Sequence, residues 1–194
     1  VVSNATLHNE DYISEKRIRI GATVLVQRAG DVIPQVLEVI KPGQVAFEFP
    51  QSCPACHARA ARSEGEVDWR CSRGLACRGR AVAQLRYFVS RQAFDIEGLG
   101  EKQIEAFYDA EIVRMPADIF KLEDFFADSA KPLSEWEGWG KTSERNLFAA
   151  IKERKSIFLD RLISALGIRH VGQGNAKLLA RHYGTLAEFE KAIF

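Results

Sequence analysis

The sequence predicts a multidomain α+β protein in which a β-rich part, a small metal-binding window and an all-helical part follow one another. Three observations lead to this prediction. Apolar residues suit short strands between Ile18 and Phe49, every cysteine lies between residues 53 and 77, and the apolar period then changes to about 3.6. We expect domains at residues 1–50, 51–78 and 79–194.

Composition and the first residues indicate the class of protein and its compartment. The chain is 46% hydrophobic and 27% charged, which is typical of folded domains. No apolar run approaches the roughly 20 residues of a membrane span, and no secretion signal opens the chain, so we expect a cytoplasmic protein. The opening Val1–Thr6 has no initiator Met and suggests a piece of a longer chain.

The net charge of +1 hides an uneven distribution of charge. Residues 53–91 and 141–194 are basic, and residues 92–140 between them are acidic. Local basic clusters attract a polyanion even when the total charge is near zero, but ordinary solvated faces produce the same pattern.

In the β-rich part we expect strands at 23–28 and 35–40, a turn at 30–31 and Pro34 at a strand start or an edge. About four short strands, with a small helix near residue 9, fit part of an OB-fold β-barrel, which fifty residues are too few to close. Arg28, at the edge of the turn, should be exposed and reach a phosphate. Val32 and Ile33 either pack in the core or form an apolar tip that touches a partner.

All four cysteines of the chain fall in one window: Cys53, Cys56, Cys71 and Cys77. Their spacing, C-x2-C-x14-C-x5-C, closes the tetrahedral thiolate site of a structural Zn²⁺. The window is poor in large apolar residues, with Val67, Trp69 and Leu75 as its main candidates, so a metal ion would supply its core. Two disulfides or a redox pair are the alternatives, and the missing secretion signal and the matched second pair favour zinc.

Three glycine-containing turns punctuate the helical part at residues 97–100, 137–140 and 169–172. The preceding helix and the helix after each turn should bury Ala81, Leu85, Phe88 and Val89; Ile104, Phe107 and Tyr108; Leu147, Ala150 and Ile151; and Ala176, Leu178 and Leu179. A capping box at 185–188 starts the last helix. This repetition predicts an all-α helix-hairpin-helix array with three hairpins.

A Gly-x-Gly turn that opens a helix presents unpaired backbone N–H groups to an anion, and glycine allows close approach. The positions predicted to contact a phosphate backbone are Gly98, Gly100, Lys102, Gly138, Gly140, Lys141 and Gly172. One such turn alone favours a plain helix connection over binding, and a lone lysine is usually solvated, but three turns at similar spacing favour binding. His170 replaces the first glycine of the third turn, and His tolerates positive φ.

The order of these motifs closely resembles the C-terminal half of bacterial NAD-dependent DNA ligase. The resemblance covers essentially the whole chain and is carried by residues 6–10, 28–35, 95–100 and 167–172 and by the cysteine spacing. It implies part of an OB-fold, a small four-cysteine zinc finger, and a helix-hairpin-helix domain that stops before its fourth hairpin.

The resemblance also implies a function, the sealing of nicks in duplex DNA during replication and repair. A lysine in a Lys-x-Asp-Gly motif attacks NAD⁺, AMP passes to the 5′-phosphate of the nick, and the 3′-hydroxyl displaces AMP. This sequence has no Lys-x-Asp-Gly, so we assign no catalytic residue, expect the NAD⁺ and Mg²⁺ sites outside the chain, and expect the chain alone to be inactive. What remains is the DNA clamp of a monomeric, nucleoid-associated enzyme, in which Arg28, Val32 and Ile33 contact nicked DNA.

Two other functions stay open at this point. The chain could be a free-standing DNA-binding module, because helix-hairpin-helix arrays also occur in nucleases and repair factors. It could also be a protein-interaction adaptor, which would show no salt-dependent DNA affinity. A Lys-x-Asp-Gly motif upstream of Val1 would decide for the ligase.

Overall fold

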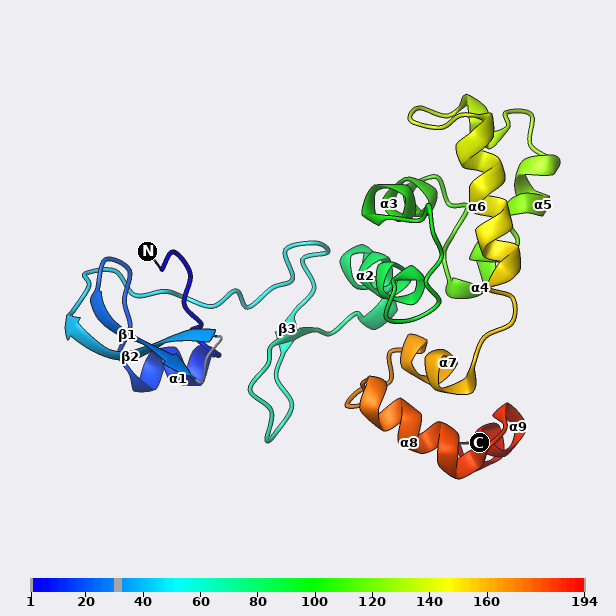
Figure 1. The fold of residues 1–194 in the computed structure, drawn as a ribbon. Coiled ribbons are helices and arrows are strands. Elements are labelled where there is room, and N and C mark those ends of the chain that lie inside the picture. Colours follow the sequence, from blue (N-terminus) through cyan, green and yellow to red (C-terminus); the bar gives the residue numbers. More distant parts are fainter. Residues whose placement is uncertain (1, 30–32, 194) are drawn as a thin grey trace. The chain divides into compact units, whose positions relative to one another are not determined.

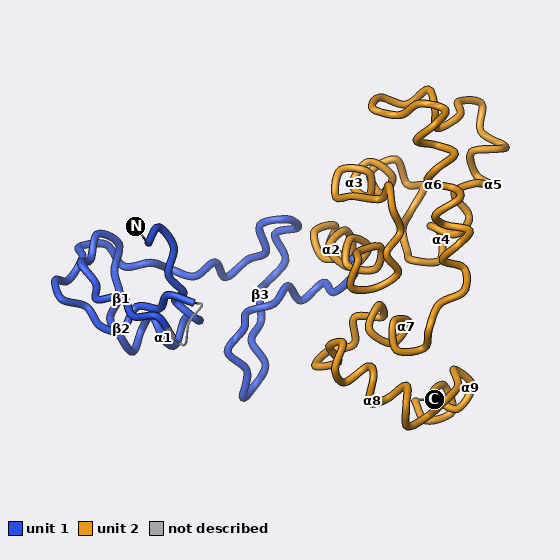
Figure 2. Tube along the Cα trace, viewed as in Figure 1, with its two compact units in different colours: residues 1–77 blue, residues 78–194 orange. Residues whose placement is uncertain are grey.

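The computed structural model describes residues 2–29 and 33–193. The chain divides into two compact units, residues 1–77 and 78–194, which Figure 2 shows in blue and orange. The β-rich part and the cysteine window both fall in the first unit, and the helical part forms the second. The separate domain boundary expected near residue 50 stays a prediction.

The first unit opens with a short helix and a β-hairpin (Figure 1): α1 (Glu10–Glu15), β1 (Thr23–Ala29) and β2 (Ile33–Lys41). Asn9 caps α1 by accepting a hydrogen bond from the Tyr12 N–H at 2.9 Å. The Tyr12 hydroxyl in turn donates to the carbonyl of Val36, which is buried in β2. Strands β1 and β2 are antiparallel, with Arg28 opposite Pro34. The expected helix and both expected strands are confirmed.

The described residues of this region form two strands instead of the expected four or so. Thr6 and Gln35 make one parallel bridge, and Ile20 and Val45 make one antiparallel bridge, but neither extends into a ladder. A strand needs consecutive hydrogen-bonded partners, and an apolar pattern alone does not supply them. Ile20 and Val45 accordingly leave 59% and 58% of their surface exposed.

The cysteine window contains very little regular structure. Two-residue strands β3 (Ala60–Ala61) and β4 (Arg70–Cys71) pair antiparallel, and a short 3-10 helix η1 (Gly74–Ala76) follows. Val67, Trp69 and Leu75, the apolar residues available for a core, are 45%, 41% and 56% exposed. Side chains this exposed do not form a core. The four cysteine side chains converge at the centre of the window instead.

The second unit is a chain of helices around one main hydrophobic core (Figure 1). Its elements are α2 (Arg78–Val89), α3 (Glu101–Asp109), α4 (Pro116–Ile119), α5 (Leu122–Ala127), the 3-10 helix η2 (Leu133–Glu135), α6 (Lys141–Glu153), α7 (Leu159–Ala165), α8 (Gln173–Tyr183) and α9 (Leu186–Ile193). The faces predicted for α2 and α3 are buried, and so are Leu147 and Ile151 of α6. Helical periodicity thus identified the part of this core that α2, α3 and α6 supply, whereas the buried residues between α3 and α6, such as Val113, Ile119 and Leu133, were not predicted.

A smaller core joins α7, α8 and α9 through Ile163, Ala176 and Phe189. The predicted burial of Leu178 is wrong, because its side chain is 62% exposed. The inward face of α8 runs from Ala176 through positions 179, 180 and 183, and Leu178 lies on the opposite side of that helix. Thr185 Oγ1 accepts the Glu188 N–H at 3.3 Å, which is one half of the predicted capping box before α9. The other half is not formed, because the Thr185 N–H donates to the Tyr183 carbonyl.

Candidate functional site

The four cysteine sulfurs converge on one point and all lie within 4.8 Å of one another. Cys53 Sγ is 3.8 Å from Cys77 Sγ, and Cys56 Sγ is 3.4 Å from Cys71 Sγ. A tetrahedral Zn²⁺ with Zn–S bonds of about 2.3 Å places its sulfurs about 3.8 Å apart, whereas a disulfide requires about 2.05 Å. The donor set and its spacing therefore fit a closed zinc site.

A tight turn carries the first cysteine pair. The Cys53 N–H donates to the Ala58 carbonyl, and the His57 N–H donates to the Cys53 carbonyl, both at 2.8 Å. His57 closes the turn at φ +56°, a conformation that His accepts more readily than most side chains. The same turn directs the N–H groups of Ala55 and Ala58 at the two sulfurs.

The electrostatics of the site also favour a cation at its centre. The Ala55 N–H lowers the pKa of Cys53 to about 7. At Cys56 the Ala58 N–H acts in the same direction, but desolvation and the neighbouring sulfurs outweigh it and raise the pKa to about 12. Crowded thiolates repel one another, so they cannot all ionise easily on their own. A divalent cation removes that repulsion by binding every sulfur as thiolate.

The second residue of each four-residue glycine turn has a positive φ. Gly98 has φ +91°, Gly138 has φ +80° and His170 has φ +63°. The left-handed region is costly for side chains other than Gly and a few polar residues such as His. The expectation that His170 preserves the turn is therefore confirmed.

The last position of each turn is the N-cap of the following helix: Gly100 for α3, Gly140 for α6 and Gly172 for α8. None of the three has a positive φ, so none needs glycine for its conformation. A Cβ at Gly140 or Gly172 would meet nothing described within 4 Å, and one at Gly100 would meet Gln103 Oε1 at 3.1 Å. Glycine at these helix starts leaves room for a group outside the chain to approach the backbone N–H groups of the first turn. At α6 the Gly140 N–H itself donates to Ser143 Oγ at 2.9 Å, so the N–H groups after it are the available ones.

The residue just before the N-cap glycine of each turn anchors that turn to a core. Leu99 is 6% exposed and belongs to the main core. Trp139 stacks on Phe107, with 6.0 Å between the ring centroids, and Val171 packs on the smaller core. The turns are therefore held in place by these residues, while Gly100 and Gly172 are exposed and Gly140 is half-exposed.

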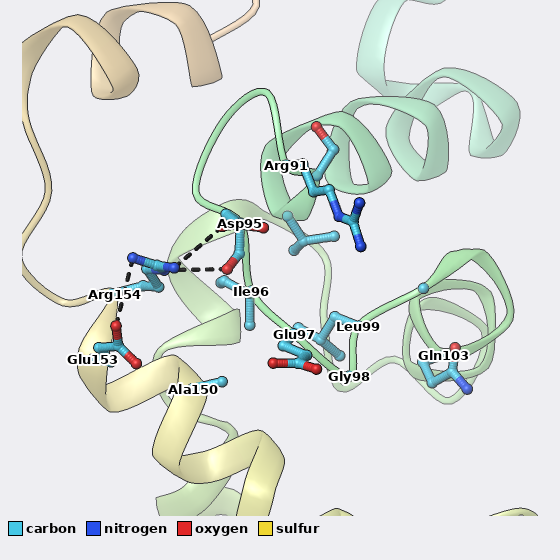
Figure 3. Close-up of a pocket in the computed structure, with 13 residues that line it drawn as sticks. Arg91, Asp95, Ile96, Glu97, Gly98, Leu99, Gln103, Ala150, Glu153 and Arg154 are labelled. Atoms are coloured by element: carbon cyan, nitrogen blue, oxygen red, sulfur yellow. Dashed lines mark hydrogen bonds and ion pairs between the residues drawn. The ribbon is translucent and has the colours of Figure 1, made fainter.

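Basic side chains surround these helix starts. Lys102 and Lys141 are exposed in the first turns of α3 and α6, where the sequence placed them. Arg91 was not predicted, and it lines the same pocket as Gly98 and Gly100 (Figure 3). No local sequence pattern indicates that Arg91 belongs to this site. The chain must first turn back after α2 to bring Arg91 to the first hairpin.

The predicted apolar tip of the first unit is described in part. Arg28 is exposed near the end of β1. Ile33, the first residue of β2, is 57% exposed, which favours the exposed tip over core packing at that residue. Val32 lies outside the described residues, as does the turn expected at residues 30–31.

Fold and sites together define a zinc-finger protein with a helix-hairpin-helix array. Three segments match family models: the NAD-dependent DNA ligase OB-fold domain at residues 1–46, the NAD-dependent DNA ligase C4 zinc finger domain at 52–78, and the helix-hairpin-helix motif at 161–194. The resemblance to bacterial NAD-dependent DNA ligase is thereby confirmed. The finger model and the converging sulfurs together support structural zinc.

Relatives named DNA ligase match along the whole chain. The protein from Afipia carboxidovorans is 56% identical over 100% of this chain and 28% of its own length. Those from Xanthobacter autotrophicus and Rhodopseudomonas palustris strain BisA53 are 56% and 55% identical over 98% and 100% of this chain. The chain spans 28% to 29% of the length of these relatives. Among the helices that the structure describes, none has the length and apolarity that crossing a membrane demands.

Proposed function

We propose that this chain is the DNA clamp of an NAD-dependent DNA ligase, which joins the 5′-phosphate to the 3′-hydroxyl at nicks in duplex DNA during replication and repair. The observation that carries the proposal is the set of three helix starts whose N-cap glycines are required neither by conformation nor by internal packing. The matches to ligase domains favour this function over a free-standing module or an adaptor.

In this proposal the three hairpins hold the sugar-phosphate backbone. The free N–H groups at the starts of α3, α6 and α8 bind phosphate oxygens, and the helix dipoles add positive potential at the same points. Lys102, Lys141 and Arg91 supply charge beside the first two helix starts. Contacts of this kind position a protein on DNA without reading its sequence.

The zinc ion has a structural role in this proposal, with Cys53, Cys56, Cys71 and Cys77 as its ligands. Four thiolates close the coordination shell and leave no position for a substrate or a reactive water. The metal instead supplies the stability that the exposed apolar side chains of the window do not. The zinc finger, at residues 51–78, then follows a partial OB-fold at 1–50 and precedes the helical domain at 79–194.

Arg28 and Ile33, together with Val32, are proposed to contact DNA at the nick. Arg28 would bind a phosphate, and the exposed Ile33 would pack against the apolar faces of the nucleotides there. The NAD⁺ and Mg²⁺ sites lie elsewhere in the ligase, because this sequence has no Lys-x-Asp-Gly. The whole enzyme is a cytoplasmic monomer, and the chain by itself binds DNA without sealing it.

The test is a titration of labelled nicked and intact duplexes at several salt concentrations. The chain should bind both, with dissociation constants of roughly 10⁻⁴ to 10⁻⁶ M at physiological salt and much weaker binding as salt rises. A Gly140→Ala/Gly172→Ala double variant should bind clearly more weakly, because the added methyl groups meet only an incoming phosphate. It should lose no more than about 1 kcal/mol of stability, since alanine is less favourable than glycine at an N-cap.

Ala110→Ser is the control, since it adds one heavy atom at the exposed C-cap of α3, at the opposite end of that helix from Gly100. It should leave binding unchanged. Salt-independent binding, or full affinity in the double variant, would contradict the clamp. Nick sealing by the chain with added NAD⁺ would contradict the placement of the chemistry elsewhere.

A further inference from the structure

An arginine at the end of α6 braces the first hairpin. Arg154 is the C-cap residue of α6, and its N–H donates to the carbonyls of Ala150 and Ile151, both at 3.2 Å. Its guanidinium reaches Asp95: Nε donates to the backbone carbonyl at 3.1 Å and Nη2 to Oδ2 at 3.2 Å (Figure 3). One side chain therefore holds both the backbone and the carboxylate of Asp95.

Asp95 sets the direction in which the chain enters the first hairpin. It has φ +56°, and its N–H donates to the Ser90 carbonyl at 2.8 Å. A non-glycine residue keeps such a conformation only where its surroundings fix it. Gly98 lies only three residues after Asp95, so a change in the backbone angles of Asp95 would move the glycine turn and the start of α3.

Arginine suits this role better than lysine. Its planar fork donates to the carbonyl and the carboxylate at once, whereas a lysine ammonium is a single point of charge on a flexible stem. The side chains of Arg154 and Asp95 are 30% and 37% exposed, so the contact is partly shielded from water. Arg154 also lies 3.7 Å from Glu153, a weaker contact on the same helix.

We propose that Arg154 is a positioning residue for DNA binding: through Asp95 it holds the first hairpin in the orientation that receives a phosphate. The inference rests on the proposed function. Helix α6 then serves both of the first two hairpins, since Gly140 at its start offers one phosphate site and Arg154 at its end positions the other. Its 13 residues separate these two points by about 20 Å.

The experiment compares duplex binding by the full chain with that of the Arg154→Met variant at several salt concentrations. We expect affinity to fall about threefold to tenfold. The dependence of affinity on salt should keep its slope, because Arg154 touches no phosphate; a lost phosphate contact would lower that slope by about one. Hydrogen exchange at residues 98–103 should speed up in the variant even without DNA.

Further variants test whether the contact between Arg154 and Asp95 is responsible for the effect. Asp95→Asn removes the carboxylate and leaves the backbone carbonyl, so it should weaken binding less than Arg154→Met. The double variant should lose little more than Arg154→Met alone, because both changes act on the same pair of residues. Arg154→Lys keeps the charge and should fall in between, and it decides the question if Arg154→Met does not fold. Arg114→Met removes an equal charge from a pair with Glu111 outside the hairpins and should bind like the wild type.

Four results would overturn the proposal. If Arg154→Met bound DNA with wild-type affinity while the Gly140→Ala/Gly172→Ala variant bound weakly, Arg154 would not be a positioning residue. The proposed function would be unaffected by that result. A salt slope lowered by about one would make Arg154 a direct phosphate contact. Absence of DNA binding by the wild-type chain would end both proposals, and unchanged hydrogen exchange at the first hairpin would end this one.

Discussion

The cysteine window and the helical unit are ordered by different means. Among the described residues of the window, Ala60 and Cys77 are the buried ones, while Trp69 keeps 41% of its surface exposed. The helical unit encloses a continuous cluster in which Phe107, Ile104 and other side chains are fully buried. Four sulfurs around one metal take the place of a core in the window, whereas many apolar contacts share that work in the helices.

This difference determines how each region should respond to damage. A metal-centred fold depends on a few ligands that cannot be replaced, so one change removes it. A packed core loses stability in proportion to the volume removed and usually survives a single substitution. The experiments below test that contrast, starting with the largest expected effect.

The largest effect should come from removing one zinc ligand. Cys71→Ser, or a strong chelator, should abolish the zinc content and unfold residues 53–77, because zinc binding contributes about 10–16 kcal/mol to such sites. Elemental analysis should find one zinc per wild-type chain and none in the variant. Far-UV circular dichroism should keep nearly all of its helical signal.

Ser72→Ala is the control, since Ser72 is the exposed neighbour of a ligand and should retain zinc. Loss of most of the helical signal on chelation would break the comparison. It would mean that the helices depend on the metal for their own order.

The next largest effect should come from removing a large side chain from the core of the helical unit. Phe107 is fully buried and lies against the rings of Phe126, Trp136 and Trp139. Phe107→Ala should lower the free energy of unfolding of the helical unit by about 3–5 kcal/mol, measured by denaturant titration, with zinc content unchanged. Phe125→Ala, at a residue that is 46% exposed, should cost less than about 1 kcal/mol. Equal costs for the two variants would contradict the assigned core.

The two regions also differ in how far the sequence predicted them. The zinc ligands follow from spacing alone, and the buried faces of α2 and α3 follow from helical period, because both signals are local. The strand count of the β-rich part failed because strand pairing depends on distant partners. The predicted burial of Leu178 was wrong because α8 packs on its core through Ala176 and Leu179, and Leu178 lies on the other side of that helix.

At the candidate site, the residues of the glycine turns could be predicted from the sequence. The arginines that lie against the first turn could not. A Gly-x-Gly pattern indicates where backbone N–H groups become free, so Gly100 and Gly140 were found. Arg91 and Arg154 reach the first hairpin only after the chain folds back, with Arg154 lying 59 residues from its partner Asp95. No spacing rule links residues so far apart.

A third test compares the two glycine positions of a turn. Gly98 has φ +91°, so Gly98→Ala should destabilise the helical unit by about 1–2 kcal/mol. Gly140 has φ −151°, and Gly140→Ala should change stability by no more than about 0.5 kcal/mol. Thermal melting of both variants measures the difference. Equal destabilisation would show that Gly140 has a structural role and would weaken the case for an external phosphate.

The smallest effect concerns acid, which should again separate the two regions. Burial alone would raise the pKa of Asp118, but the N–H groups of Arg114 and Met115 donate to its Oδ2 and hold the pKa below its ordinary 3.8. Because the folded pKa lies below the unfolded one, this stabilisation is present above about pH 4 and is lost as pH falls through the folded pKa. Protons compete with zinc for thiols whose ordinary pKa is 9.0, so the window should release its metal at a higher pH than the helices unfold.

An acid titration that follows both zinc release and helical signal tests this order of events. Asp118→Asn should cost up to about 1 kcal/mol of helical stability at pH 7, because the amide keeps an acceptor for the two N–H groups but loses the charge. The wild type and the variant should then converge in stability once the pH has fallen below the folded pKa of Asp118, since a protonated Asp118 also lacks that charge. Zinc release should follow the same curve in both proteins. A variant that released zinc at a shifted pH would show that Asp118 stabilises the window as well, and the two regions could no longer be treated as independently ordered.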